Sequence, residues 1–320
     1  MRPGVRHAWL LAAALAWAPP AFADTPADTG DADGQGLPAT LLLGGLLSES
    51  RVLYPLQVGD WRAVSEQRFP DQRYGVAVRY VDGERWLDLY FYPGGPQAPE
   101  LLAQVARAER ENIDAAARES DRGIRLGELQ EIGLAGEGGA QVPAWRLGLE
   151  YPGEQRASAM LLFARNLYLV KARASAPPPA TPASLLAEVQ AFMEVVAAQV
   201  RIASTGECWL PERLEVVDAL PDPAAPQVFA SYRDPGKATA AVVTAAGVQV
   251  ARVEAARAQG LATELAAALY PGCVAPEAIE PEVPPHMREI RIEYRIPAAD
   301  DSDRRSPPVG RPRPPLRGTG

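Results

Sequence analysis

The sequence is poor in the residue types that most often carry chemistry. Its 320 residues include two histidines, His7 and His286, and two cysteines, Cys208 and Cys273. Histidine is the commonest metal ligand and general base, and zinc or iron–sulfur sites use several cysteines. These counts exclude a multi-histidine metal site, a four-cysteine zinc site and an iron–sulfur cluster. We therefore predict no metal site and no cofactor.

Short catalytic and nucleotide-binding motifs are also missing. The sequence has no GxSxG, no SxxK, no Walker loop and no GxGxxG. Carboxylates remain, because Asp88, Glu150 and Glu154 lie on or beside predicted strands and two such groups can act as a glycosidase pair. Solvent-facing acids on strands are the ordinary alternative. An enzymatic activity stays open, and its absence is the favoured interpretation.

Residues 1–23 have the pattern of a secretory signal peptide. Two arginines precede an apolar stretch rich in Leu and Ala, and Ala21-Phe22-Ala23 supplies the small residues of a cleavage site. A membrane anchor would need about 20 apolar residues, and this stretch is shorter and interrupted by Pro19-Pro20. We predict cleavage after Ala23, a periplasmic location and no membrane span in the mature chain.

The charge balance is acidic. The whole chain has 32 Lys+Arg against 40 Asp+Glu, a net charge of −8. Cleavage removes Arg2 and Arg6, so 30 cations remain against 40 acids and the net charge becomes −10. General nucleic-acid binding needs a basic surface and is excluded. The expected partner is a protein of the cell envelope.

The two cysteines are predicted to form a disulfide. Cysteines in an oxidising compartment usually pair, and a Cys208–Cys273 bond would close a loop of about 65 residues. The alternative is a reactive thiol, which requires a CxxC motif or a nearby histidine to lower its pKa. The sequence has neither, so the structural bond is favoured.

Hydrophobic periodicity predicts an α+β protein of two domains. Asp82-Gly83 is typical of a hairpin turn between two alternating strands, helices are expected at 99–119 and from Thr181 to Val200, and a meander lies between them. The predicted organisation runs as follows: signal peptide 1–23, flexible leader 24–50, first domain 51–203, second domain 204–298 with both cysteines, and disordered Arg/Pro tail 299–320.

Three aromatic residues share one face of a predicted strand. Trp86, Tyr90 and Tyr92 alternate with Leu87, Leu89 and Phe91. Aromatic side chains on a sheet face supply large, rigid contact area, so this row is the candidate ligand-binding face. Core packing beneath a helix is the alternative.

Three stretches of the first domain carry a family resemblance: RYGVAVRYVDGERWLDLYFY, MLLFARNLYLVKARASAP and SLLAEVQAFMEVVAAQVRI. In this order they resemble the PsbP/DcrB group over residues 51–203. The resemblance implies an antiparallel sheet with flanking helices and a non-enzymatic accessory, assembly or binding role. It transfers no functional residues.

The second domain resembles another family more faintly. GVQVARVEAARAQGLATELAAALYPG followed by REIRIEYRIP is similar to the C-terminal domain of TonB. Together these observations predict a secreted, periplasmic accessory or protein-interaction protein. The alternatives are a secreted hydrolase that uses carboxylates and a small-ligand carrier that uses the aromatic strand face.

Overall fold

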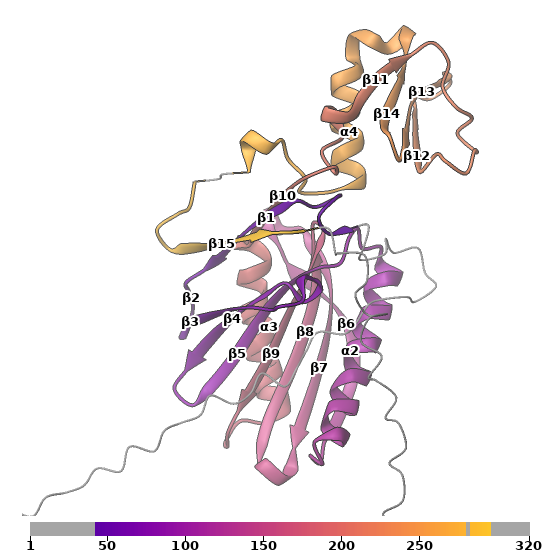
Figure 1. Cartoon of the computed structure of the whole chain (residues 1–320). Coiled ribbons are helices and arrows are strands. Elements are labelled where there is room, and N and C mark those ends of the chain that lie inside the picture. The colour runs from indigo at the N-terminus through magenta and orange to yellow at the C-terminus, as the bar shows by residue number, and fades with distance from the viewer. Residues whose placement is uncertain (1–41, 280–281, 296–320) are drawn as a thin grey trace, which may run out of the picture.

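The computed structural model describes residues 42–279 and 282–295 (Figure 1). The predicted signal peptide 1–23 and the tail 299–320 lie outside these ranges, and so do residues 24–41 of the predicted leader. No helix in the described ranges combines the length and the apolarity needed to cross a bilayer. Antiparallel sheets and three α-helices in these ranges confirm the expected mixture of helices and strands.

The largest element is an eight-stranded antiparallel sheet with the order β2-β3-β4-β5-β9-β8-β7-β6. Two meanders join where β5 pairs with β9. Gly83, in the predicted hairpin turn between β4 and β5, has a φ of 58°, which glycine adopts readily. The strands are β2 (Gln57–Val58), β3 (Trp61–Arg68), β4 (Val76–Asp82), β5 (Arg85–Pro93), β6 (Arg125–Ala135), β7 (Gln141–Tyr151), β8 (Arg156–Arg165) and β9 (Tyr168–Ala176).

Two helices cover the two faces of this sheet. α2 (Pro99–Glu119) packs Leu102 and Ile113 into the core that contains Tyr90 and Tyr92. α3 (Pro182–Gln199) begins with a capping box of Thr181 and Ser184 and packs into the core on the opposite face. Successive residues of β5 are buried on both sides because each face has a cover.

A smaller sheet closes one end of the same core. Its central strand β1 (Glu49–Pro55) pairs antiparallel with β10 (Arg201–Thr205) on one side and with β15 (Met287–Glu293) on the other. The apolar face of β15 packs into the core that α3 covers. Short 3-10 helices connect several strands of the chain: η1 (Gln72–Tyr74), η2 (Glu137–Gly139), η3 (Pro152–Glu154), η4 (Leu210–Arg213), η5 (Arg252–Arg257) and η6 (Pro276–Ala278).

This sheet corrects two of the predicted boundaries. The division at 203/204 falls inside β10, and β15, which was assigned to the second domain, completes the core of the first. Alternation reveals that a strand has one buried face, and it does not reveal which sheet buries that face. The leader prediction is also wrong for residues 42–50: Leu43 and Leu47 are 2% and 0% exposed, because this leucine-rich turn packs into the main core.

Residues 210–269 form the part that we call the distal unit. Its sheet has the order β11-β14-β13-β12, and α4 (Ala258–Leu269) covers one face with a core of its own. The unit stands beyond one end of the large sheet (Figure 1). It lies in the chain between β10 and β15, two strands that flank β1. The strands are β11 (Leu214–Val217), β12 (Ala230–Arg233), β13 (Thr239–Thr244) and β14 (Gly247–Ala251).

Candidate functional site

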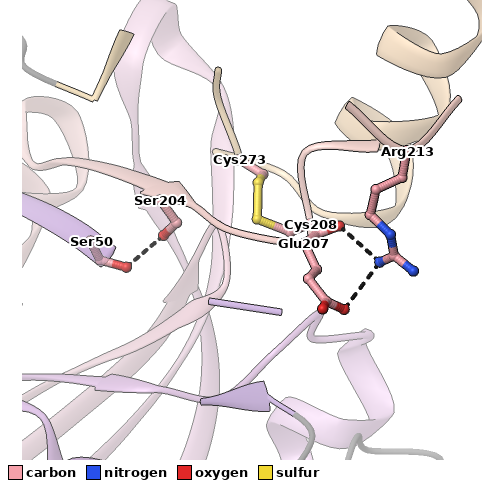
Figure 2. Close-up of a disulfide and its surroundings, with 6 residues drawn as sticks. All are labelled: Ser50, Ser204, Glu207, Cys208, Arg213 and Cys273. Atoms are coloured by element: carbon pink, nitrogen blue, oxygen red, sulfur yellow. Dashed lines mark hydrogen bonds and ion pairs between the residues drawn. A yellow bond between two sulfur atoms is a disulfide. The ribbon is translucent and has the colours of Figure 1, made fainter. Parts of the chain in front are cut away.

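The predicted cysteine pair lies where the chain passes into and out of the distal unit. The two Sγ atoms of Cys208 and Cys273 are 1.89 Å apart and the Cα atoms 6.0 Å apart, which confirms a disulfide (Figure 2). The two residues are 0% and 7% exposed and belong to the main core, not to the core of the distal unit. Such a bond is compatible with an extracytoplasmic location.

Three chain segments meet around this disulfide. We call residues 45–48, 204–209 and 270–274 together the neck. The Cys208 amide donates to the Leu46 carbonyl (3.1 Å), so the incoming segment pairs with the segment that precedes β1. The Ser204 amide donates to the Gly272 carbonyl (2.9 Å), and the Val274 amide donates to the Ser204 carbonyl (2.8 Å). The outgoing segment therefore lies beside β10 like a short extra strand.

Two glycines let the neck segments approach closely. Gly206 has a φ of 143°, and a Cβ there would lie 2.6 Å from the Leu46 carbonyl oxygen. Gly272 has a φ of 81°, and a Cβ there would lie 2.2 Å from Asn166 Nδ2. Asn166 in turn donates to the Ile202 carbonyl at 2.5 Å. Both positions need glycine for the backbone conformation and for the space.

A buried pair of hydroxyls lies beside the disulfide. Ser50 Oγ and Ser204 Oγ are 2.8 Å apart and join β1 to β10 (Figure 2). The hydroxyls of Tyr168 and Tyr294 also hydrogen-bond to each other, which joins β9 to the end of β15. Burial raises the pKa of Tyr168 well above its ordinary value, so this hydroxyl stays neutral. The two hydroxyl pairs therefore join neighbouring strands.

The incoming side of the neck is tied to the distal unit by an ion pair. Arg213 Nη1 donates to Glu207 Oε2 (3.1 Å) and to the Glu207 carbonyl (3.4 Å), as Figure 2 shows. Arg213 also donates to the Ala245 carbonyl in the turn between β13 and β14. Trp209 and Tyr270 pack against both the main core and the distal core. These two aromatic residues therefore connect the two cores.

The aromatic row does not form an open ligand face. Tyr90 and Tyr92 are each 2% exposed, because they belong to the core that α2 shares with the sheet and Phe69 stacks on Tyr90. The Tyr92 hydroxyl donates to Glu109 Oε1 (2.9 Å), and burial raises the pKa of Tyr92 well above its ordinary value. Trp86 is partly exposed, with the Arg79 guanidinium 4.9 Å from the ring centroid. The prediction of a ligand-binding row is wrong, and the core-packing alternative is right for both tyrosines.

A buried ion pair beneath α2 was not predicted. Lys171 Nζ lies 3.0 and 2.9 Å from the two carboxylate oxygens of Glu109, and the side chains are 1% and 2% exposed. The same ammonium lies 4.9 Å from the ring centroid of Tyr90. The one signal in the sequence was Lys171, one of two lysines in the chain, within the fully buried strand YLVKARASA.

The three acids considered for hydrolysis are each held by a different arginine. Asp88 accepts two hydrogen bonds from Arg79 (2.6 and 2.5 Å). Glu150 pairs with Arg125 at 3.3 Å, and Glu154 pairs with Arg122 at 2.6 Å. Within the described ranges, no group of three or more His, Cys, Asp or Glu residues could hold a metal ion.

Comparisons with known proteins find no family and a weak structural likeness over a segment of the chain. No family model and no curated protein matches the chain. Among solved structures, the solution structure of cyanobacterial PsbP (CyanoP) from Synechocystis sp. PCC 6803 matches with 14% identity, over 54% of this chain and 98% of that chain, at a TM-score of 0.33. The chain thus has a weak likeness to PsbP over a segment, as its sequence indicated.

Proposed function

We propose that this chain is an accessory protein of the cell envelope that binds another protein through its distal unit. The observation that carries the proposal is the attachment of this unit to the main core through the disulfide-bonded neck. In this proposal residues 210–269 act as a second domain, and α2, the large sheet and α3 act as a PsbP-like sandwich. The sandwich and the distal unit have separate hydrophobic cores, which supports treating them as two domains.

Export is part of the same proposal. The chain is made with a signal peptide, cleaved after Ala23, and works in the periplasm. A disulfide persists in oxidising compartments and is rare in the cytosol, so the Cys208–Cys273 bond supports this location.

One margin of the distal unit has features that suit a partner. β12 is the last strand in the order of its sheet, and Phe229, directly before it, is 63% exposed. Exposed aromatic residues are enriched among those that dominate binding energy at protein interfaces. Edge strands also offer unpaired backbone groups to another chain. We therefore place the partner at Phe229 and the outer edge of β12.

Site-specific photo-crosslinking tests this function. A photoreactive phenylalanine analogue replaces Phe229 in the full-length protein, and the same analogue at exposed Gln104 of α2 is the control. We expect one adduct of constant mass from position 229 in periplasm, and we expect excess unmodified protein to suppress it. Equal adducts from both positions, or none from position 229, would contradict the proposal.

A further inference from the structure

The disulfide is placed at the neck and outside the core of the distal unit. Cys208 precedes Leu210, the first residue of the distal core, and Cys273 follows α4. The bond therefore links the two ends of the distal unit to each other. It contributes no side chain to the packing between α4 and its sheet.

Apart from this bond, the incoming and outgoing segments differ in how they continue into the main core. Residues 204–208 continue from β10 and pair with residues 45–48 through the Cys208 and Glu207 amides. The outgoing segment also has two backbone hydrogen bonds, both with Ser204, together with the close approach of Gly272 to Asn166 and the packing of Tyr270 against both cores. Among the described residues beyond it, the next strand is β15. The disulfide is the one covalent constraint on the outgoing side.

We propose that the Cys208–Cys273 disulfide is a redox-sensitive clamp on the distal unit. In the oxidised protein the clamp holds both ends of the unit at the neck. Reduction releases the outgoing segment, so the unit moves about its incoming segment while the main and distal cores stay folded. The clamp thus controls orientation and leaves the folding of each core unchanged.

The reaction needs a dithiol as its partner. A thiolate of the dithiol attacks Cys273 Sγ, because Cys273 is 7% exposed whereas Cys208 is fully buried. The Cys208–Cys273 bond breaks, Cys208 leaves as a thiolate, and a mixed disulfide forms on Cys273. The second thiol of the dithiol then attacks the dithiol's own sulfur in the mixed disulfide, the bond to Cys273 Sγ breaks, and Cys273 leaves as a thiolate. Two electrons and two protons pass to the cysteines, and the dithiol becomes a disulfide. Because both sulfurs are buried, the neck must open before the attack, and reduction should be slow.

Hydrogen exchange on the full-length mature protein tests the clamp. The oxidised protein and protein reduced with dithiothreitol are compared by mass spectrometry. After reduction we expect about tenfold faster amide exchange in peptides that cover residues 270–279. Exchange in β8 and β9 of the main core, and in β13 and α4 of the distal core, should stay the same.

A variant with Cys208→Ser and Cys273→Ser is the matched control. It should show the reduced pattern without dithiothreitol and should not respond to it. Faster exchange throughout residues 210–269 after reduction would overturn the proposal, because the bond would then be maintaining the distal core itself. No change at residues 270–279 would overturn it as well. If the double variant fails to fold, the exchange rates of oxidised and reduced wild-type protein still test the proposal.

Discussion

Lys171 and Glu109 form an ion pair that is buried between β9 and α2, with both carboxylate oxygens within 3.0 Å of the ammonium. The Tyr92 hydroxyl donates to the same carboxylate, so three side chains from β5, β9 and α2 meet at one point. A buried charge is tolerated when it is paired and hydrogen-bonded. This contact therefore joins α2 to β5 and β9 through polar groups beside the apolar core that α2 shares with the sheet.

Removing only the cation of this pair should strongly destabilise the protein. Lys171→Met leaves the Glu109 carboxylate buried without its partner, and we expect a loss of about 3–5 kcal/mol in the free energy of unfolding. Urea denaturation measures the loss. Adding Glu109→Gln removes the charge and keeps an acceptor for Tyr92, so at least half of the stability should return.

The other lysine of the chain provides the control. Lys237 pairs with Asp234 and its side chain is 65% exposed, so Lys237→Met should change stability by about 1 kcal/mol or less. Equal effects of Lys171→Met and Lys237→Met would show that burial of the first pair has no energetic importance.

Acid should weaken the distal unit through Asp234. Hydrogen bonds from Arg257 (2.6 Å), Lys237 (3.2 Å) and Tyr232 (3.0 Å) lower the pKa of Asp234 to about 2 from 3.8. A lowered carboxylate pKa in the folded state gives stability that is present above pH 3.8 and is lost as the pH falls towards 2.

The measurement is the urea midpoint of the wild type and of Asp234→Asn at pH 5 and at pH 2.5. At pH 5 we expect a higher urea midpoint for the wild type than for Asp234→Asn. At pH 2.5 we expect the difference between the two midpoints to shrink. A difference that stays constant over this range would show that the ionised carboxylate contributes nothing.

The close packing of the neck predicts a cost at Gly272. Gly272→Ala puts a side chain on a residue with left-handed backbone conformation and pushes its methyl group against Asn166. Backbone strain alone costs about 1–3 kcal/mol, so we expect the free energy of unfolding to fall by more than this amount. Gly236→Ala has a similar φ of 73° with nothing within 4 Å of its Cβ, and it isolates the backbone cost. Thermal unfolding should rank Gly272→Ala as clearly less stable than Gly236→Ala, and equal melting temperatures would argue against the crowding.

The place of β15 in the main core can be tested with Ile290. This residue is 1% exposed and packs into the core that α3 covers, so Ile290→Ala should cost about 2–5 kcal/mol. Hydrogen exchange should become faster in β1 and β10 and stay unchanged in β13. The surface variant Arg288→Ala should leave both regions unchanged. Loss of protection in β13 alone would place β15 with the distal unit after all.

Local patterns predicted much of the fold. The Asp82-Gly83 turn, the helix from Pro99 and the cap at Thr181 were visible because each depends on residues close together in the sequence. The disulfide was predicted because two cysteines in a chain with the pattern of a signal peptide leave one intramolecular pairing.

Long-range choices were not visible in the sequence. β15 pairs with β1 across more than 230 residues, and nothing in REIRIEYRI names its partner strand. The burial of Tyr90 and the pairing of Lys171 with Glu109 both depend on where α2 lies, which periodicity does not specify. The ligand face was predicted wrongly for this reason.

The two ends of the distal unit lie together at one point of the main core, with 6.0 Å between the Cα atoms of Cys208 and Cys273. β10 leads into this point and β15 pairs with the other side of β1, and the register of both strands with β1 does not involve residues 210–269. The neck is thus a natural grafting position. We expect a short loop or an unrelated domain with closely spaced termini to replace the distal unit there and to leave the three-stranded sheet in register.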